Sequence, residues 1–188
     1  EKGNSIMVAV QVVKPKNKQE EPLWFVKLHK NVKRLSHNDV FRARLYAQQM
    51  VEVDIRDTMR TIHVELLFGH GAYTTGTTHS PGALRCVYIE LGAAGFKNFV
   101  NLLGTFRVPG TKFPVERDAL RPDFFYGLSR LLATTELSFV KLKTGLSNGH
   151  SAAEIFAVKE QIPAFDREGK IAAMVQALEK SILTGLGT

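Results

Sequence analysis

The stretch LRCVYIELGAAGFKNFVNLL, residues 84–103, changes its hydrophobic pattern midway and decides the fold expected for this chain. Residues 84–91 are rich in β-branched and aromatic side chains and follow a connection rich in Gly, Thr, Ser and Pro, which is typical of a strand. Further on, apolar residues recur at i, i+3, i+4 and i+7, namely Phe96, Phe99, Val100 and Leu103. This spacing is that of an amphipathic helix, so the sequence predicts a strand that leads into a helix over 92–105.

Similar β-branched, aromatic or alternating runs predict further strands on both sides of this stretch. They cover residues 5–13, 23–29, 40–47, 51–55, 61–68, 137–143 and 155–161. Helical spacing returns in two further segments, 122–133 and 166–184, with Pro122 suited to a first helical turn.

A weak repeat links the two ends of this arrangement. The strand at 86–91 leads into a helix, and the strand at 155–161 leads through Pro163 into the last helix. The sequence therefore predicts an α+β fold with two antiparallel β-sheets, each closed by a C-terminal helix, as a duplicated β-β-β-β-α unit. We expect one domain over 1–188, with a strand-rich half at 1–108 and a second half at 109–188 that contains both later helices.

Positive charge is concentrated in the first part of the chain. The 188 residues have a net charge of +7. Residues 1–60 hold twelve Lys and Arg against seven Asp and Glu, residues 61–115 add +2, and residues 116–188 are balanced with nine of each sign. An excess of this size favours a polyanionic partner, and its distribution directs that partner to the first 115 residues.

The composition excludes several classes of protein. Gly and Pro are near average and no heptads persist, which excludes a collagen-like fibre, a disordered tail and a coiled coil. A single Cys86 permits no internal disulfide and fits an intracellular reducing compartment. No apolar stretch approaches 18 residues, so we expect no membrane span. The chain begins at Glu1, which is compatible with a removed leader or with an engineered start.

Basic residues with interleaved aromatics are the main functional signal. On a strand, Arg42, Arg44 and Tyr46 would share one face, where cations meet phosphates and aromatic rings stack on unpaired bases. The predicted nucleic-acid-binding residues are Lys14, Lys16, Lys27, Lys30, Lys33, Arg34, Arg42, Arg44, Tyr46, Arg56 and Arg60. The alternative interpretation is that these cations form ordinary solvent-facing surfaces of the sheets and that the aromatics are core.

Motifs for catalysis or metal binding are weak. His63, His70 and His79 match no ligand spacing, and no acid accompanies them. The Gly- and Thr-rich loop at 69–78 precedes a predicted strand, whereas a phosphate cradle would open a helix. The sequence therefore indicates a protein that is not an enzyme and needs no cofactor or metal.

The predicted layout resembles that of the Whirly-type single-stranded nucleic-acid-binding proteins. The residues that carry the resemblance are VYIEL at 87–91 leading into 96–103, and Ile162-Pro163 leading into 171–183. The Lys-Gly-Lys-Ala signature of the plant members is absent, with Lys14-Pro15-Lys16 the nearest sequence, so the trypanosomatid mitochondrial guide-RNA-binding proteins are the closer group. The resemblance implies binding of single strands across sheet faces, promotion of RNA annealing in organellar RNA processing, a homo- or hetero-oligomer (commonly a tetramer), and a mitochondrial matrix location.

Taken together, the sequence predicts a largely sequence-independent protein that binds single-stranded RNA or DNA through phosphates and base stacking. The choice between RNA and DNA stays open. The alternative function is a structural or assembly subunit of a larger complex or virion, whose basic face contacts a partner.

Overall fold

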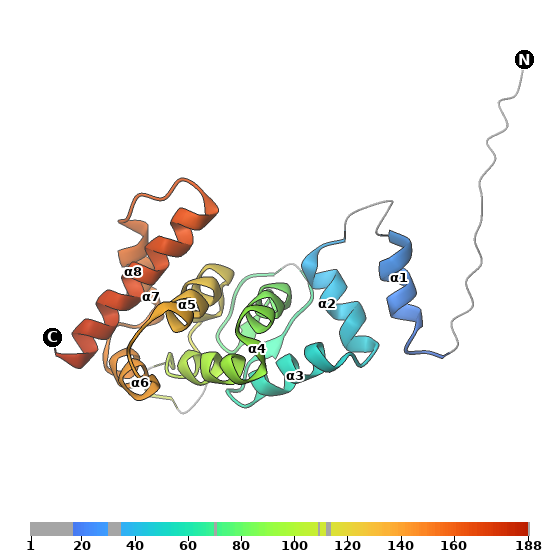
Figure 1. The fold of residues 1–188 in the computed structure, drawn as a ribbon, viewed down its shortest axis with the longest axis horizontal. Coiled ribbons are helices and arrows are strands. Elements are labelled where there is room, and N and C mark those ends of the chain that lie inside the picture. The colour runs from blue at the N-terminus through green and yellow to red at the C-terminus, as the bar shows by residue number, and fades with distance from the viewer. Residues whose placement is uncertain (1–16, 30–34, 70, 109, 112–113, 188) are drawn as a thin grey trace, which may run out of the picture.

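Helices dominate the structure of this protein. The structure is a computed structural model that describes residues 17–29, 35–69, 71–108, 110–111 and 114–187 (Figure 1). Helices account for 66% of it and strands for 4%. The predicted α+β fold with two antiparallel sheets is therefore wrong, because the described residues form eight α-helices and one two-stranded parallel sheet.

The elements follow one another as α1 (Glu21–His29), α2 (His37–Tyr46), α3 (Met50–Arg60), β1 (Glu65–Leu66), β2 (Thr77–Thr78), α4 (Pro81–Leu103), the 3₁₀ turn η1 (Asp118–Leu120), α5 (Pro122–Thr134), α6 (Phe139–Asn148), α7 (Ala152–Glu160) and α8 (Arg167–Leu186). The predicted helices at 92–105, 122–133 and 166–184 are confirmed as the second part of α4, as α5 and as α8.

Most predicted strands are helices instead. The segments 23–29, 40–47, 51–55, 84–91, 137–143 and 155–161 lie in or overlap α1, α2, α3, α4, α6 and α7, respectively. Only residues 65–66 of the segment 61–68 form a strand, and 5–13 lies outside the described residues. The repeat of a strand followed by a helix is therefore wrong in both of its copies.

The segment 84–91 shows why a predicted strand is a helix in the structure. Its side chains also fit a helical period, because Leu84, Val87, Tyr88 and Leu91 stand at i, i+3, i+4 and i+7. Leu84 and Val87 are completely buried. Packing of this face against neighbouring helices outweighs the β-propensity of Val and Ile, which spans only about 1 kcal/mol per residue.

Helix α4 bends at Gly92, and the bend joins the two halves of the molecule. Gly92 has φ 68° and ψ 176°, a backbone conformation that glycine adopts at little cost. Before the bend, the phenol of Tyr88 donates a hydrogen bond of 2.8 Å to Asp54 of α3. After it, the ring of Phe99 lies 6.0 Å from that of Phe125 in α5.

A buried carboxylate holds α2, α3 and α4 together. Glu52 of α3 is only 1% exposed. Its Oε1 lies 2.7 Å from Nε of Arg85 in α4 and 3.7 Å from Nη1 of Arg44 in α2. Leaving a buried charge without its partner costs about 3–5 kcal/mol, so these two arginines stabilise the amino-terminal half.

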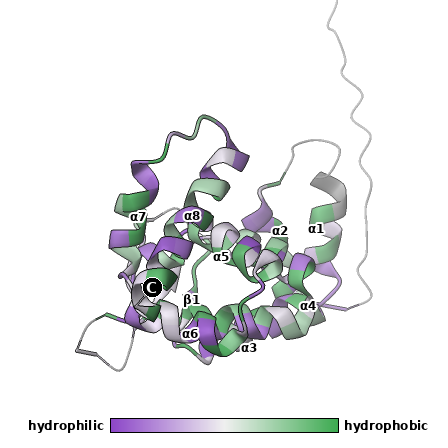
Figure 2. Ribbon diagram, turned by 60° about the vertical axis from the view of Figure 1, so that its left-hand side comes forward, coloured by the Kyte–Doolittle hydropathy of each residue, from purple (hydrophilic) through white to green (hydrophobic). Residues whose placement is uncertain are grey.

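Helix α8 packs against α5, α6 and α7 and organises the carboxyl-terminal half. Hydrophobic and hydrophilic segments alternate along the helices, as amphipathic helices around a shared core require (Figure 2). One cluster of buried side chains runs from Phe41 in α2 to Ile182 in α8. Within the half, α6 and α8 approach closely because glycines face each other, and a Cβ on Gly185 would collide with the carbonyl oxygen of Gly145.

We expect Gly185→Ala to destabilise the protein by about 1–3 kcal/mol, because the added methyl overpacks the contact between α6 and α8. Alanine is otherwise the better helix former, so a gain in stability would contradict this packing. The measurement is urea denaturation followed by circular dichroism. Gly69→Ala is the matched control, since a Cβ there has no neighbour within 4 Å, and its stability should stay within about 0.5 kcal/mol of the wild type.

Candidate nucleic-acid interface

A groove of about 710 Å³ opens beside α3 at the amino-terminal end of the molecule. Its walls are the end of α2, the outer face of α3 and the segment that follows α3. We call it the α3 groove and define it by its lining residues, Leu45, Tyr46, Gln48, Arg56, Arg60, His63, Val64, Glu65, Leu66 and Phe68. Three of them, Tyr46, Arg56 and Arg60, belong to the predicted nucleic-acid-binding set.

The basic side of the groove follows from helical spacing. Arg56, Arg60 and His63 stand at i, i+4 and i+7, so they project from one face of α3 and the turn after it. The adjoining face of α3 carries Ile55 and Met59, which are both fully buried. Burial of that apolar face therefore turns the cations outward into the groove.

Asp57 orients the two arginines. Its Oδ1 lies 2.8 Å from Nε of Arg56 and 3.7 Å from Nη1 of Arg60. The hydrogen bond from Arg56 lowers the pKa of Asp57, which therefore stays ionised. A guanidinium has five N–H donors, and the Arg60 side chain is 65% exposed. Both arginines thus keep donors for an anion while Asp57 restricts their rotamers.

The turn after α3 brings His63 to the groove. The N–H of Val64 donates to the carbonyl of Met59 at 3.2 Å, and that of His63 donates to Arg60 at 3.0 Å. This pair of bonds is the Schellman motif, which satisfies the last carbonyls of a helix and needs a left-handed residue. His63 is that residue, with φ 59°.

Helix α2 ends in the same way. The N–H of Gln49 donates to Arg44 at 3.0 Å and that of Gln48 to Leu45 at 3.0 Å, and Gln48 has φ 54°. Gln48 and His63 are the two non-glycine residues with positive φ in the described part of the chain. A left-handed non-glycine residue costs about 1–3 kcal/mol, and such residues cluster at functional sites. Both of them line the α3 groove.

An exposed aromatic ring lies at the same place. Tyr46 is 65% exposed at the end of α2. Phe68 lines the groove from the other side, and its ring centroid lies 6.1 Å from that of the buried Phe41. Tyr46 is therefore free to stack on a flat ligand, whereas Phe68 is supported from behind by the core.

The other predicted site residues do not join this groove in the described structure. Arg42 lies 3.9 Å from Asp39 on the exposed side of α2. Arg44 is turned toward the buried Glu52 and is only partly exposed to solvent. A helix places residues 42 and 46 on one side and residue 44 on another. Lys27 is in α1, and its side chain lies outside the described part. The remaining predicted positions, Lys14, Lys16, Lys30, Lys33 and Arg34, also lie outside the described residues.

The sequence interpretation missed Gln48, His63 and Phe68. His63 matches no metal-ligand spacing, and neither Gln48 nor Phe68 belongs to a charged pattern. A signal for His63 was nevertheless available, because a polar residue after the last basic turn of a helix is a frequent left-handed terminator when glycine is absent.

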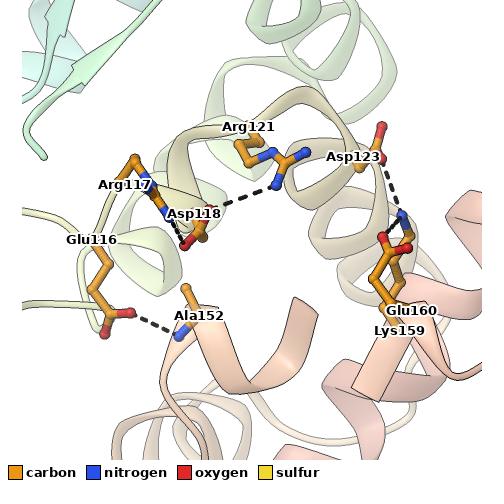
Figure 3. Close-up of polar contacts among 8 residues, drawn as sticks. All are labelled: Glu116, Arg117, Asp118, Arg121, Asp123, Ala152, Lys159 and Glu160. Atoms are coloured by element: carbon orange, nitrogen blue, oxygen red, sulfur yellow. Dashed lines mark hydrogen bonds and ion pairs between the residues drawn. The ribbon is translucent and has the colours of Figure 1, made fainter. Parts of the chain in front are cut away.

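A second charged cluster, between η1, α5 and α7, is internally neutralised (Figure 3). The ammonium of Lys159, 7% exposed, lies 2.8 Å from Glu160 and 3.4 Å from Asp123. Arg117 and Arg121 both face Asp118, at 3.1 and 3.6 Å. Cations and acids are matched here, so the cluster joins helices and offers no surplus charge to a polyanion.

No family model, curated protein or solved structure matches this chain. In the described residues, no group of three or more His, Cys, Asp or Glu side chains is placed to hold a metal ion. None of the described helices has the length and apolarity needed to cross a membrane.

Glu116 provides a test by pH, because its carboxylate accepts a hydrogen bond of 2.9 Å from the N–H of Ala152 at the start of α7. Burial raises the pKa of Glu116 above its ordinary value of 4.5. A raised folded-state pKa stabilises the fold below the unfolded pKa, and that contribution is lost as the pH rises through the folded pKa. We therefore expect Glu116→Gln to gain stability relative to the wild type as the pH rises above about 4.5.

Urea denaturation of both proteins across this pH range measures the difference. Glu154→Gln, at the same end of α7, is the matched control with the opposite sign. Hydrogen bonds from Ser151 lower the pKa of Glu154, so its contribution is present at neutral pH and is lost as the pH falls. Parallel pH profiles for the two variants would show that burial does not control Glu116.

Proposed function

We propose that the protein binds single-stranded RNA or DNA in the α3 groove, largely without regard to base sequence. The observation that supports this most is the convergence on one groove of two arginines, an exposed tyrosine and the two strained turn residues. Arg56 and Arg60 would neutralise phosphates, and Tyr46 would stack on a base. The concentration of net charge in the first 115 residues also supports a polyanionic ligand.

The proposed mechanism is passive binding without catalysis. Stacking on Tyr46 occupies the face of a base and leaves its pairing edge exposed, which suits annealing to a second strand. The annealing activity, the oligomeric state and the mitochondrial location that the resemblance implied remain predictions. The resemblance to the Whirly-type proteins implied that single strands bind across sheet faces. The described structure has no such faces, so the proposed contacts come from helices and turns.

A structural or assembly subunit is the second candidate function. Several large apolar side chains are exposed in the structure, including Phe165 at 99%, Val140 at 72% and Ile89 at 60%. Such side chains suit contacts with another protein surface. This candidate predicts a large assembly whose mass does not change when a random-sequence oligonucleotide is added.

We expect the double variant Arg56→Ala, Arg60→Ala to weaken binding of a random-sequence single-stranded oligonucleotide. The plot of log K against log salt has a negative slope, and it should become shallower by about 1.4. Each lost phosphate contact removes about 0.7 from the magnitude of this slope for a single strand. Fluorescence anisotropy at several salt concentrations measures this slope. The control is Arg117→Ala, Arg130→Ala, which removes two exposed, ion-paired arginines outside the groove. Equal slopes for wild type and groove variant would contradict the proposed site.

Tyr46→Ala tests the stacking contact separately. We expect a loss of about 1–3 kcal/mol in binding free energy with an unchanged salt slope, because stacking releases no counterions. Phe165→Ala removes another highly exposed aromatic side chain and is the matched control. If the two variants bind equally well, Tyr46 does not stack on the ligand.

A further inference from the structure

A second groove lies on the other side of α3. Two adjoining hollows of about 460 and 300 Å³ share Thr61 and Asn101 as lining residues. They run between the end of α3, the second part of α4 and α6. We call the pair the α4–α6 groove.

The charged side chains that line the α4–α6 groove in the described structure are all positive. Its charged lining residues are Lys97, Arg107 and Lys143, and none of the described residues that line either hollow is acidic. The polar remainder is hydroxyl and amide, represented by Thr61, Asn101 and Ser147. The α3 groove differs because it is lined by two aromatic side chains, Tyr46 and Phe68, and by the acid Glu65. The cluster in Figure 3 differs because its charges are matched.

The cations of this groove come from exposed faces of well-packed helices. Lys97 projects from the side of α4 opposite the buried Phe99 and Leu103, and Asn101 follows it one turn later. Lys143 is exposed on α6 next to the buried Leu142. Neither lysine forms an ion pair with any described residue. Both ammonium groups therefore lack an acid within the described structure that would compete with a bound anion.

Arg107 is positioned by the backbone at the end of α4. Its Nε donates a hydrogen bond of 2.9 Å to the carbonyl of Gly104. This bond satisfies one of the last carbonyls of α4 and fixes the guanidinium at the rim of the groove.

The end of α3 and the turn after it border both grooves. Arg60 and His63 face the α3 groove, while Thr58 and Thr61 face the α4–α6 groove. Residues 60 and 61 are neighbours in the chain, so a ligand that passes over this turn enters the second groove directly.

We propose that a single strand bound in the α3 groove continues over the end of α3 into the α4–α6 groove, which binds its sugar-phosphate backbone alone. This inference rests on the proposed function and adds the second half of the binding path. The absence of aromatic side chains from the described lining of the α4–α6 groove means that no base stacks there. Contacts to phosphates and sugars give this part of the path no base preference.

The test compares oligonucleotides of about 4 and about 16 nucleotides, a span that covers known single-strand site sizes. The variant is Lys97→Ala, Lys143→Ala, and the control is Lys141→Ala, Lys180→Ala, which removes two exposed lysines that line neither groove. For the long strand, we expect the groove variant to have a salt slope that is smaller in magnitude by about 1.4, as two lost phosphate contacts require. For the short strand, the slope and affinity should not change.

The outcomes separate the inference from the function on which it rests. If the wild type binds neither strand, both are overturned. If Arg56→Ala, Arg60→Ala lowers the slope while Lys97→Ala, Lys143→Ala leaves the long strand unaffected, only the continuation is overturned. An equal loss in the Lys141 and Lys180 control also overturns it, because the effect would then come from net charge. Thermal unfolding of each variant confirms that the loss is not one of folding.

Discussion

The bend of α4 at Gly92 is the constraint on which the other elements depend. A straight helix of this length would pack one continuous stripe against one set of neighbours. With the bend, the part before Gly92 completes the amino-terminal helices through Arg85 and Tyr88, and the part after it enters the aromatic core through Phe99. Both grooves inherit their geometry from this bend, since their common wall, α3, packs on α4.

The helices with wide apolar faces could be predicted from the sequence, and the others could not. Helix α8 shows the helical period from Ile171 to Ile182, over about three turns. The segment 84–91 fits a period of two as well as one of 3.6, because Val87 and Ile89 favour strands locally. One local signal marks the start of α7 as a helix, although the β-propensity of the residues that follow favours a strand. Ser151 and Glu154 form a capping box at the start of α7, and a Ser followed three residues later by Glu marks a helix start. Recognising it would have corrected the strand expected at 155–161.

The candidate site could be predicted in part, because the distribution of charged residues along the chain does not depend on the fold. This distribution indicates the half of the chain that contains Arg56 and Arg60, but it does not indicate which arginines face solvent. Alternation on a strand placed Arg44 beside Arg42, whereas the turn of a helix directs it toward a buried acid. Lys97 and Lys143 are far apart in the chain and share a groove only because α4 and α6 pack together, so no local pattern connects them.

The buried Glu52, with Arg85 and Arg44, should make the fold less sensitive to salt than contacts at the protein surface. Exposed contacts between cations and phosphates weaken steeply with ionic strength, because counterions return to the nucleic acid. Buried pairs such as Glu52 with Arg85 are screened far less. If the two grooves bind a single strand as proposed, there should therefore be a range of salt in which they release it while α2, α3 and α4 keep their packing. Within that range a bound strand would leave the protein without unfolding it.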